Sequence, residues 1–451
     1  MTRRTKTAAP RLLTPAVVKA MEADFAANDT YRVMQNAVTH VSADSLVKQR
    51  EIVTEADHSF SIKLDDWKAT AQMKSGRCWL FAGLNLLRAG AAKKMKLKDF
   101  EFSQNWTLFW DKLEKANHFF ESMIATVDRP VDDRTVAFLL KDPIGDGGQW
   151  NMFVNLVTKY GLVPKAAMPE TESSSNTSVM NSLLVAKLRQ GARTLRELGA
   201  GGASGGELRE AKGELLAVIH RILCIHLGTP PRTFDWQWHD KDKKFHRDPR
   251  MTPQKFAKKY VALPIEDYVC LVHDPRPSSP VGRTFTVDFL GNVDGGAPVT
   301  YLNVDIGLIK KIALRTLRAK EPVWFGCDVG KQMDGEKGLW DARLKDFGSI
   351  YGTDFELDKA SRLQYGAACM THAMVFTGVD VVAGKPRRWR VENSWGEERG
   401  VKGFFLMNDS WFDEHMFEIA ARRSYLPRKL QDALDRKPIV LPAWDPMGSL
   451  A

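Results

Sequence analysis

The stretch Gln72-Met-Lys-Ser-Gly-Arg-Cys78-Trp79 decides how the rest of the chain is interpreted. It places a cysteine at the start of residues 78–95, whose leucines recur at the three- and four-residue spacing of a helix. The exposed N–H groups and the dipole at a helix start favour the thiolate form of Cys78. Gln72 lies on a glycine-containing loop that can fold back, so that its amide and the Cys78 N–H form an oxyanion-binding site. The plainer alternative is a buried structural cysteine, which describes most isolated cysteines at a helix start.

A thiolate nucleophile also needs a base and a group that orients the base. Among the ten histidines, His372 is the best candidate because it stands at the head of an apolar strand predicted over 373–382. Asn393 ends the next predicted strand, and a Gly-Lys-Pro turn between the two strands would bring both residues side by side. The Asn393 amide oxygen would then accept a hydrogen bond from the imidazole and hold its tautomer, with Trp395 shielding that bond from water.

These three groups of residues, taken in order, resemble the papain-like cysteine peptidases. The resemblance rests on Gln72 with Cys78-Trp79, on His372-Ala373, and on the run Asn393-Ser394-Trp395-Gly396. It implies an α+β, papain-like two-lobed fold, in which a helical lobe carries Cys78 and a β-rich lobe carries His372 and Asn393. It also implies that Cys78, His372, Asn393 and Gln72 are the catalytic residues.

Further stretches resemble one branch of that family, which contains bleomycin hydrolase and bacterial aminopeptidase C. They are Ser75-Gly-Arg-Cys-Trp79, Asp146-Gly-Gly-Gln-Trp150, Tyr160-Gly-Leu-Val-Pro164, Asp274-Pro-Arg-Pro-Ser-Ser279 and the tail 441–451. The separation of Cys78 and His372 is 372 − 78 = 294 residues, against about 130–150 in compact members of the family. About 150 residues must therefore be inserted.

Two long helical patterns around the glycine-rich run 199–206 predict a helical hairpin as part of that insertion. We expect the following segments: an N-terminal helical arm (1–58), a helical lobe with the nucleophile (59–170), the inserted hairpin (171–232), a mixed insertion and β-rich lobe with His372 and Asn393 (233–440), and a C-terminal arm (441–451).

The C-terminal arm is expected to be extended, because Pro442, Pro446 and Gly448 oppose a stable helix. Its apolar side chains argue against free exposure to solvent, although a frayed terminus is the alternative. The resemblance implies that the arm lies in the active-site cleft and restricts substrates to those with a free N-terminus. The Ala451 carboxylate would then meet the substrate ammonium group.

Gly147-Gly148 has two open interpretations. Papain-like enzymes use a glycine backbone in this region to hydrogen-bond an extended substrate, so both residues are candidate substrate-binding residues together with Trp395. The pair could equally be only the turn before a helix.

The composition bears on the compartment of the protein and on its need for a metal or cofactor. Five cysteines in 451 residues, an odd and sparse set, indicate reduced thiols and a cytoplasmic protein. The start lacks the apolar core of a secretory signal, and no stretch is apolar enough to span a membrane. His220, Cys224 and His226 lack a fourth ligand, so no metal is expected, and no cofactor is implied.

The net charge of +10 is compatible with a polyanionic partner. Basic side chains concentrate in the runs 93–98 and 385–390, where a solvated helix end and a hairpin are the plainer explanations. Members of the resembling family form six-subunit rings, so a homohexamer is expected. Weak binding of nucleic acid to a basic ring lining is a hypothesis.

The expected function is a cytosolic cysteine aminopeptidase that removes N-terminal residues from peptides through a Cys78 thioester. An endopeptidase or acyltransferase with the same Cys-His-Asn site is the alternative. The remote third alternative is a nucleic-acid-binding ring without catalytic activity, and only the net charge supports it.

Overall fold

A computed structural model describes residues 12–64 and 67–450. The chain divides into two compact units, one formed by residues up to 56 together with 342–357, and the other by residues 57–341 together with 358–451.

The smaller unit is a set of short helices. They are α1 (Pro15–Ala26), α2 (Asp29–Val38), α3 (Ala43–Leu46), α4 (Arg50–Thr54) and α14 (Phe347–Tyr351). Thr14 caps α1 by accepting from the Val17 N–H, and Pro15 stands at the first turn, where its missing N–H costs nothing. Backbone hydrogen bonds from Gln49 to Leu344 and from Asp346 to Val47 join the two chain segments of the unit.

The larger unit carries the remaining helices and the strands. Its helices are α5 (Cys78–Met95), α6 (Gln104–Ala125), α7 (Arg134–Lys141), α8 (Trp150–Tyr160), α9 (Glu172–Ser175), α10 (Ser178–Ala200), α11 (Gly205–Leu227), α12 (Pro253–Tyr260), α13 (Ile306–Arg318), α15 (Lys359–Gln364), α16 (Asp409–His415) and α17 (Arg428–Leu434). Its strands are β1 (Ile62–Lys63), β2 (Phe234–His239), β3 (Phe245–Met251), β4 (Tyr268–Val272), β5 (Thr284–Val287), β6 (Tyr301–Asn303), β7 (Val323–Cys327), β8 (Met333–Asp334), β9 (Leu339–Trp340), β10 (His372–Val382), β11 (Lys385–Glu392), β12 (Phe404–Asn408), β13 (Met416–Arg422) and β14 (Ile439–Leu441).

Helix α5 is the central element of the helical lobe, and it begins at the residue that the sequence predicts. Its side chains are buried on all sides over the first three turns, as expected for a helix that is apolar around its whole circumference. It packs against α6 and α8 on one side and against β7 and β10 on the other. Gly83 permits the close approach of α8, because a Cβ there would lie 2.7 Å from the Phe153 ring.

A mixed sheet forms the second lobe, with the strand order β14-β5-β6-β4-β13-β7-β10-β11-β12-β9-β8. Strand β10 pairs antiparallel with both β7 and β11, and the register places Val375 opposite Glu392. The start of β10 and the end of β11 therefore lie at the same edge of the sheet. Helix α13 covers the sheet with the buried residues Ile309, Ile312 and Leu317.

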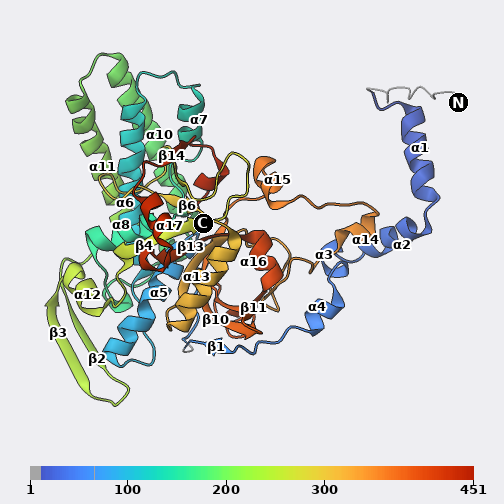
Figure 1. The fold of residues 1–451 in the computed structure, drawn as a ribbon. Helices are drawn as coiled ribbons and strands as arrows, with labels where there is room; N and C mark the ends of the chain where they lie inside the picture. Colours follow the sequence, from blue (N-terminus) through green and yellow to red (C-terminus); the bar gives the residue numbers. More distant parts are fainter. Residues whose placement is uncertain (1–11, 65–66, 451) are drawn as a thin grey trace. The chain divides into compact units, whose positions relative to one another are not determined.

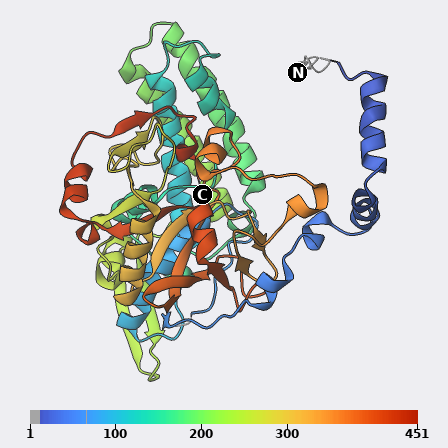
Figure 2. The same cartoon turned by 45° about the vertical axis from the view of Figure 1, so that its right-hand side comes forward.

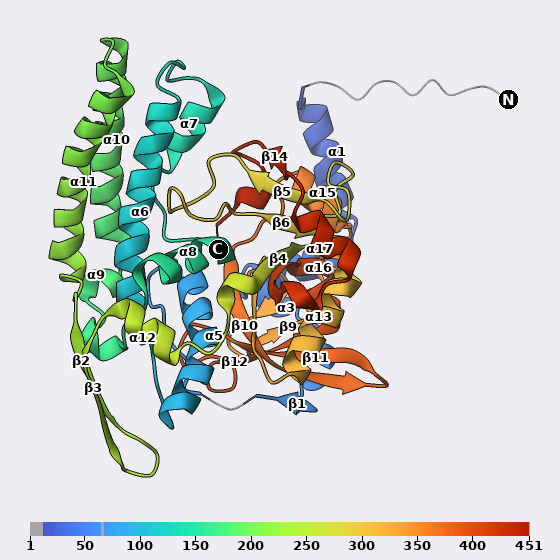
Figure 3. The same ribbon diagram turned by 60° about the vertical axis from the view of Figure 1, so that its left-hand side comes forward.

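Helices α10 and α11 form the long hairpin expected within 171–232, and both pack along α6 (Figures 1, 2 and 3). The break between them is shorter than the glycine run suggests, because only residues 201–204 are outside the helices. Ser204 and Glu207 form a capping box that starts α11, and this box fixes the connection. Gly199 belongs to α10, where a Cβ would lie 2.3 Å from Val127.

The C-terminal arm is ordered along the described part of its length. It begins at Leu441, the last residue of β14, which pairs in parallel with β5 at the sheet edge, and Asp445 forms a 2.8 Å ion pair with the buried Arg276. Arg134 stacks 3.9 Å above the Trp444 ring. The α+β, two-lobed fold with an ordered C-terminal arm is thus confirmed, and the alternative of a frayed terminus is wrong for residues up to 450.

The basic run 385–390 forms strand β11, where several of its charges are engaged within the lobe. Arg387 pairs with Asp380 at 2.7 Å, and Arg388 pairs with Asp57 at 3.4 Å. Arg390 is buried, donates to Thr377 Oγ1 and lies over the Phe404 ring. Across the ranges 12–64 and 67–450, no helix has the length and apolar character needed to cross a bilayer.

The hairpin core gives a stability prediction. Leu188 of α10 is fully buried, so Leu188→Ala should lower the free energy of unfolding by about 2–5 kcal/mol through the cavity it leaves. Leu183 on the same helix is 49% exposed, and Leu183→Ala should change that free energy by less than about 0.5 kcal/mol. Urea unfolding followed by circular dichroism measures both; equal shifts would contradict the packing described.

Candidate active site

Cys78 stands at the start of α5 and is 2% exposed. Burial raises the pKa of its thiol to about 11, because the thiolate would lose water. Hydrogen bonds from the backbone N–H groups of Ala373, Trp79 and Cys78 lower the pKa. The N–H groups at the helix start thus act in the predicted direction, and burial outweighs them.

His372 begins β10 and lies beside Asn393. Its Nε2 donates to Asn393 Oδ1 at 2.9 Å, and the same oxygen accepts from the Ser394 N–H at 2.8 Å. With the proton on Nε2, the lone pair is on Nδ1. The Trp395 ring centroid lies 5.1 Å from that of the imidazole. Burial lowers the pKa of His372 to about 4, against the opposing effect of the Asn393 hydrogen bond.

Cys78 and His372 line one cavity. Burial disfavours the thiolate and the imidazolium when either forms alone. Transfer of the proton from Sγ to the imidazole creates both charges at once, and each then offsets the cost of burying the other. The geometry therefore suits a nucleophile that becomes charged through proton transfer to its base.

Gln72 also lines this cavity. Its Oε1 accepts from Ser394 Oγ at 2.6 Å, and its Nε2 donates to the Ser75 carbonyl. Because Oε1 is held by a donor, the amide NH2 group is oriented and one N–H remains for a further acceptor. The Gln72 amide is thereby held by the residue that follows Asn393.

Backbone hydrogen bonds reinforce this link between the lobes. The Gln72 N–H donates to the Ser394 carbonyl at 2.8 Å, and the Gly396 N–H donates to the Thr70 carbonyl at 3.0 Å. Behind them, Arg88 of α5 forms a buried ion pair with Glu392, the last residue of β11. The segment 392–396 thus holds both the imidazole partner and the oxyanion loop.

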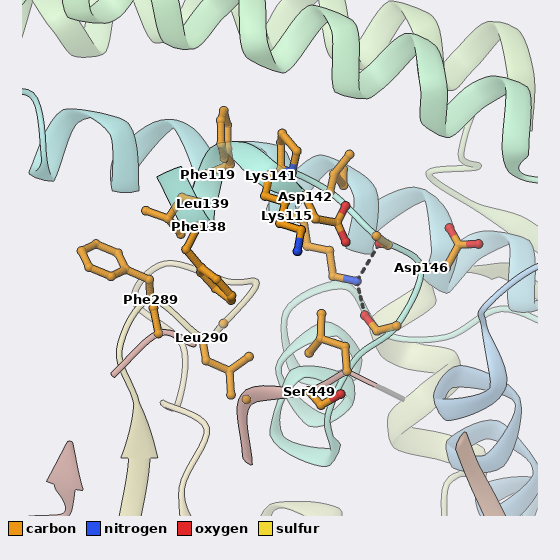
Figure 4. Close-up of a pocket in the computed structure, with 18 of the residues that line it drawn as sticks. Lys115, Phe119, Phe138, Leu139, Lys141, Asp142, Asp146, Phe289, Leu290 and Ser449 are labelled. Atoms are coloured by element: carbon orange, nitrogen blue, oxygen red, sulfur yellow. Dashed lines mark hydrogen bonds between the residues drawn. The ribbon is translucent and has the colours of Figure 1, made fainter. Parts of the chain in front are cut away.

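The cavity that contains Cys78 and His372 has a volume of about 800 Å³. One wall is apolar and consists of Phe119, Phe138, Leu139, Phe289 and Leu290, which group together in Figure 4. The described end of the C-terminal arm supplies another wall, including Trp444, Ser449 and Leu450. A space of this size, with apolar walls and a few polar groups, is typical of a ligand site.

Two hydrogen bonds seat the arm in the cavity. Ser449 Oγ donates to the Met370 carbonyl at 2.9 Å, and Gln149 Nε2 donates to the Ser449 carbonyl at 2.5 Å. Ala451, which the sequence analysis assigns to substrate binding, lies outside the described residues.

The two glycines of the pair differ in their surroundings. Gly147 lines the cavity, whereas a Cβ at Gly148 would lie 2.4 Å from the Trp79 ring. Lys115 is buried behind this loop and donates to the carbonyls of Gly145 at 3.2 Å and Gly147 at 2.5 Å (Figure 4). The geometry leaves Gly147 available to a ligand and gives Gly148 a packing role.

Nothing in the sequence singles out Lys115 or Asp111. Lys115 pairs with Asp111 of the same helix at 2.7 Å, an i,i+4 spacing that usually marks a solvated face. Both side chains are buried here, because they lie beneath the loop that precedes α8. Their spacing on α6 carries no signal that distinguishes a buried pair from an exposed one.

The remaining candidate cluster, His220, Cys224 and His226, does not surround a common point. Cys224 Sγ lies 3.7 Å from His220 Nδ1, whereas His226 Nδ1 bonds to Ser173 Oγ. All five cysteines are within the described residues and are free thiols.

The catalytic geometry and the fold define a class, the papain-like cysteine peptidases. A family model described as the Peptidase C1-like family matches residues 12–448, and the chain belongs to this family. A crystal structure of PepW from Lactobacillus rhamnosis HN001 superposes with a TM-score of 0.96 at 45% identity, over 98% of this chain and all (100%) of that chain.

Curated relatives narrow the class to one branch. Aminopeptidase C of Lactobacillus delbrueckii subsp. lactis is 41% identical over 435 residues, which cover 95% of this chain and 97% of that protein. Bleomycin hydrolase of Rattus norvegicus is 42% identical over 423 residues, 92% of this chain and 93% of that protein. The predicted aminopeptidase C and bleomycin hydrolase type is confirmed.

The buried imidazole gives a titration prediction. In a Cys78→Ala variant, His372 should titrate near pH 4, because burial disfavours the imidazolium, and the ring should be neutral at pH 6. Replacing Asn393 with Ala in that background should lower the pKa further, since Asn393 stabilises the protonated ring. Carbon-13 NMR of labelled histidine measures this; titration of His372 near 6.5 would contradict it.

Proposed function

We propose that this protein is a cysteine aminopeptidase that removes N-terminal residues from peptides through a thioester on Cys78. The observation that carries the proposal is one cavity that holds Cys78, the His372–Asn393 pair and the C-terminal arm together. The catalytic residues are Cys78, His372, Asn393 and Gln72, and Gly147 is the backbone edge for the substrate.

Acylation begins when the Cys78 thiol gives its proton to His372 Nδ1 and the sulfur attacks the peptide carbonyl carbon. The carbonyl oxygen becomes an oxyanion, which the Gln72 amide and the Cys78 N–H stabilise. His372 then protonates the leaving amine as the C–N bond breaks. Water, deprotonated by His372, hydrolyses the thioester and releases the amino acid, and the proton returns to the sulfur.

The C-terminal arm supports the choice of aminopeptidase over endopeptidase. Its residues up to Leu450 occupy cavity space that an endopeptidase would leave to the substrate. An acyltransferase or endopeptidase with the same catalytic residues is the alternative, and the endopeptidase would require the arm to leave this position.

The activity test compares an aminoacyl fluorophore with its N-acetylated form. The wild-type protein should cleave the free aminoacyl substrate at least tenfold faster, and Cys78→Ala should abolish turnover, because loss of the nucleophile of such a unit costs many orders of magnitude. Preference of the wild type for the blocked substrate would overturn the aminopeptidase.

Removal of residues 449–451 should raise cleavage of the blocked substrate if the arm closes the cleft.

We also propose a homo-oligomer, a homohexamer by family resemblance, located in the cytoplasm. Helix α1 contains no buried residue, and Val18, Met21 and Phe25 share one face of it with 40% or more of each residue exposed. An apolar helix face of this kind indicates a protein partner. The five free thiols fit a reducing compartment.

Light scattering tests the assembly. A hexamer of 50.8 kDa chains should have a mass of about 300 kDa. Replacing Met21 and Phe25 with Glu should lower the mass if α1 lies in an interface, because buried unpaired charges are costly there. Ala20→Glu, on the opposite face of the same helix, is the matched control. A monomeric wild type would refute the oligomer.

A further inference from the structure

We propose that Arg77 and Asp146 are positioning residues, which fasten the loop before Cys78 to residues 170–181, the segment that leads into the inserted helical hairpin. The proposal rests on the proposed function only in taking Cys78 as the nucleophile. Neither residue touches the reacting atoms. Both fix the position of residues that do.

Arg77 directly precedes Cys78 and is fully buried. Its guanidinium forms a two-pronged ion pair with Glu170, with distances of 3.0 Å and 2.8 Å, and its Nε donates to Ser75 Oγ at 2.9 Å. The planar fork permits little rotation when both prongs are engaged. The residue adjacent to the nucleophile is therefore anchored through its side chain.

Glu170 is itself held by the start of the insertion. Its Oε2 accepts from Ser174 Oγ at 2.7 Å, and Ser174 takes part in the capping box of α9 with Thr171. The backbone of this segment also pairs with the loop, because the Lys74 N–H donates to the Ser175 carbonyl at 2.9 Å. The anchor for Arg77 is thus a folded element and not a mobile surface chain.

Asp146 makes the second attachment. Its carboxylate accepts from the Gly76 N–H at 2.9 Å, from Thr177 Oγ1 at 2.5 Å and from Asn181 Nδ2 at 2.8 Å. It also pairs with Lys112 Nζ at 2.7 Å, while the Asp146 carbonyl accepts from Trp79 Nε1 at 2.7 Å. One residue therefore bonds to both sides of Cys78 and to two residues of the insertion.

The carboxylate form of Asp146 is needed for this arrangement. Burial alone would raise its pKa, but the charge of Lys112 and the hydrogen bonds of Lys112, Thr177 and Asn181 hold the pKa well below its usual range. The attachment also leaves little space, because a Cβ at Gly76 would lie 3.0 Å from the Asp146 Cβ. The loop and Asp146 fit one another closely.

These contacts matter for catalysis because His372 and Gln72 are held by a different part of the chain. Ser394 and Asn393 fix the base and the oxyanion amide, whereas Arg77 and Asp146 fix the sulfur. A displacement of about 1 Å between reacting groups can cost about 100-fold in rate. Loosening the attachment should therefore lower kcat more than it changes KM.

The test uses Glu170→Gln and Thr177→Val, which remove the charge or the hydroxyl without a large change of volume. Each should lower kcat on the aminoacyl fluorophore about tenfold and leave KM within about twofold. The rate at which iodoacetamide alkylates Cys78, read on the Cys78 peptide by mass spectrometry, should fall in parallel. Thr126→Val is the matched control, since Thr126 is buried and its hydroxyl donates to the Ser122 carbonyl of α6 rather than to the loop before Cys78.

Leu188→Ala separates positioning from general stability. It should lower the unfolding midpoint through the hairpin core while kcat stays within about twofold of wild type. The proposal is overturned if Glu170→Gln and Thr177→Val leave kcat and alkylation unchanged, or if Leu188→Ala lowers kcat as much as they do. A wild type inactive on aminoacyl substrates, with alkylation still slowed in both variants, would refute the aminopeptidase and leave the positioning intact.

Discussion

The hydrogen bond between Ser394 and the Gln72 amide is the interaction on which the site depends. It joins a loop of the helical lobe to the end of β11 in the other lobe, across 322 positions of the chain. The nucleophile and its base come from different lobes, so neither lobe alone can set their separation. The hydrogen bonds around Ser394 and the buried Arg88–Glu392 pair make that separation a property of the folded unit.

Burial has two effects in this arrangement. It raises the pKa of Cys78 and lowers that of His372, so an isolated charge on either group is unfavourable. The same low-polarity surroundings strengthen every hydrogen bond and every attraction between opposite charges that form there. The site therefore favours the state in which the thiolate and the imidazolium form together, and it disfavours either charge alone.

Much of this fold could be predicted from the sequence, because its signals were local. The start of α5 at Cys78, the strand that begins at His372, the strand that ends just before Asn393, and the two helices of the hairpin all follow from apolar spacing and nearby turn residues. The contacts of Arg77 and Asp146 could not be predicted in this way. Their partners Glu170, Thr177 and Asn181 are polar residues at a helix start, where a solvated cap is the usual outcome. Only the tertiary fold places them against the nucleophile loop.

The position of the C-terminal arm has a consequence for how a long peptide would be shortened. In the proposed reaction the arm, which lines the cavity together with Cys78 and is fixed at Ser449 by two hydrogen bonds, limits how much of the substrate the acyl side can hold. In the proposed reaction the shortened peptide is the leaving amine, so it departs before water hydrolyses the thioester. The shortened peptide makes no further contact on the acyl side that would retain it. Each removed residue would then require a new encounter, so the proposed reaction predicts distributive trimming, with intermediates of every length in solution.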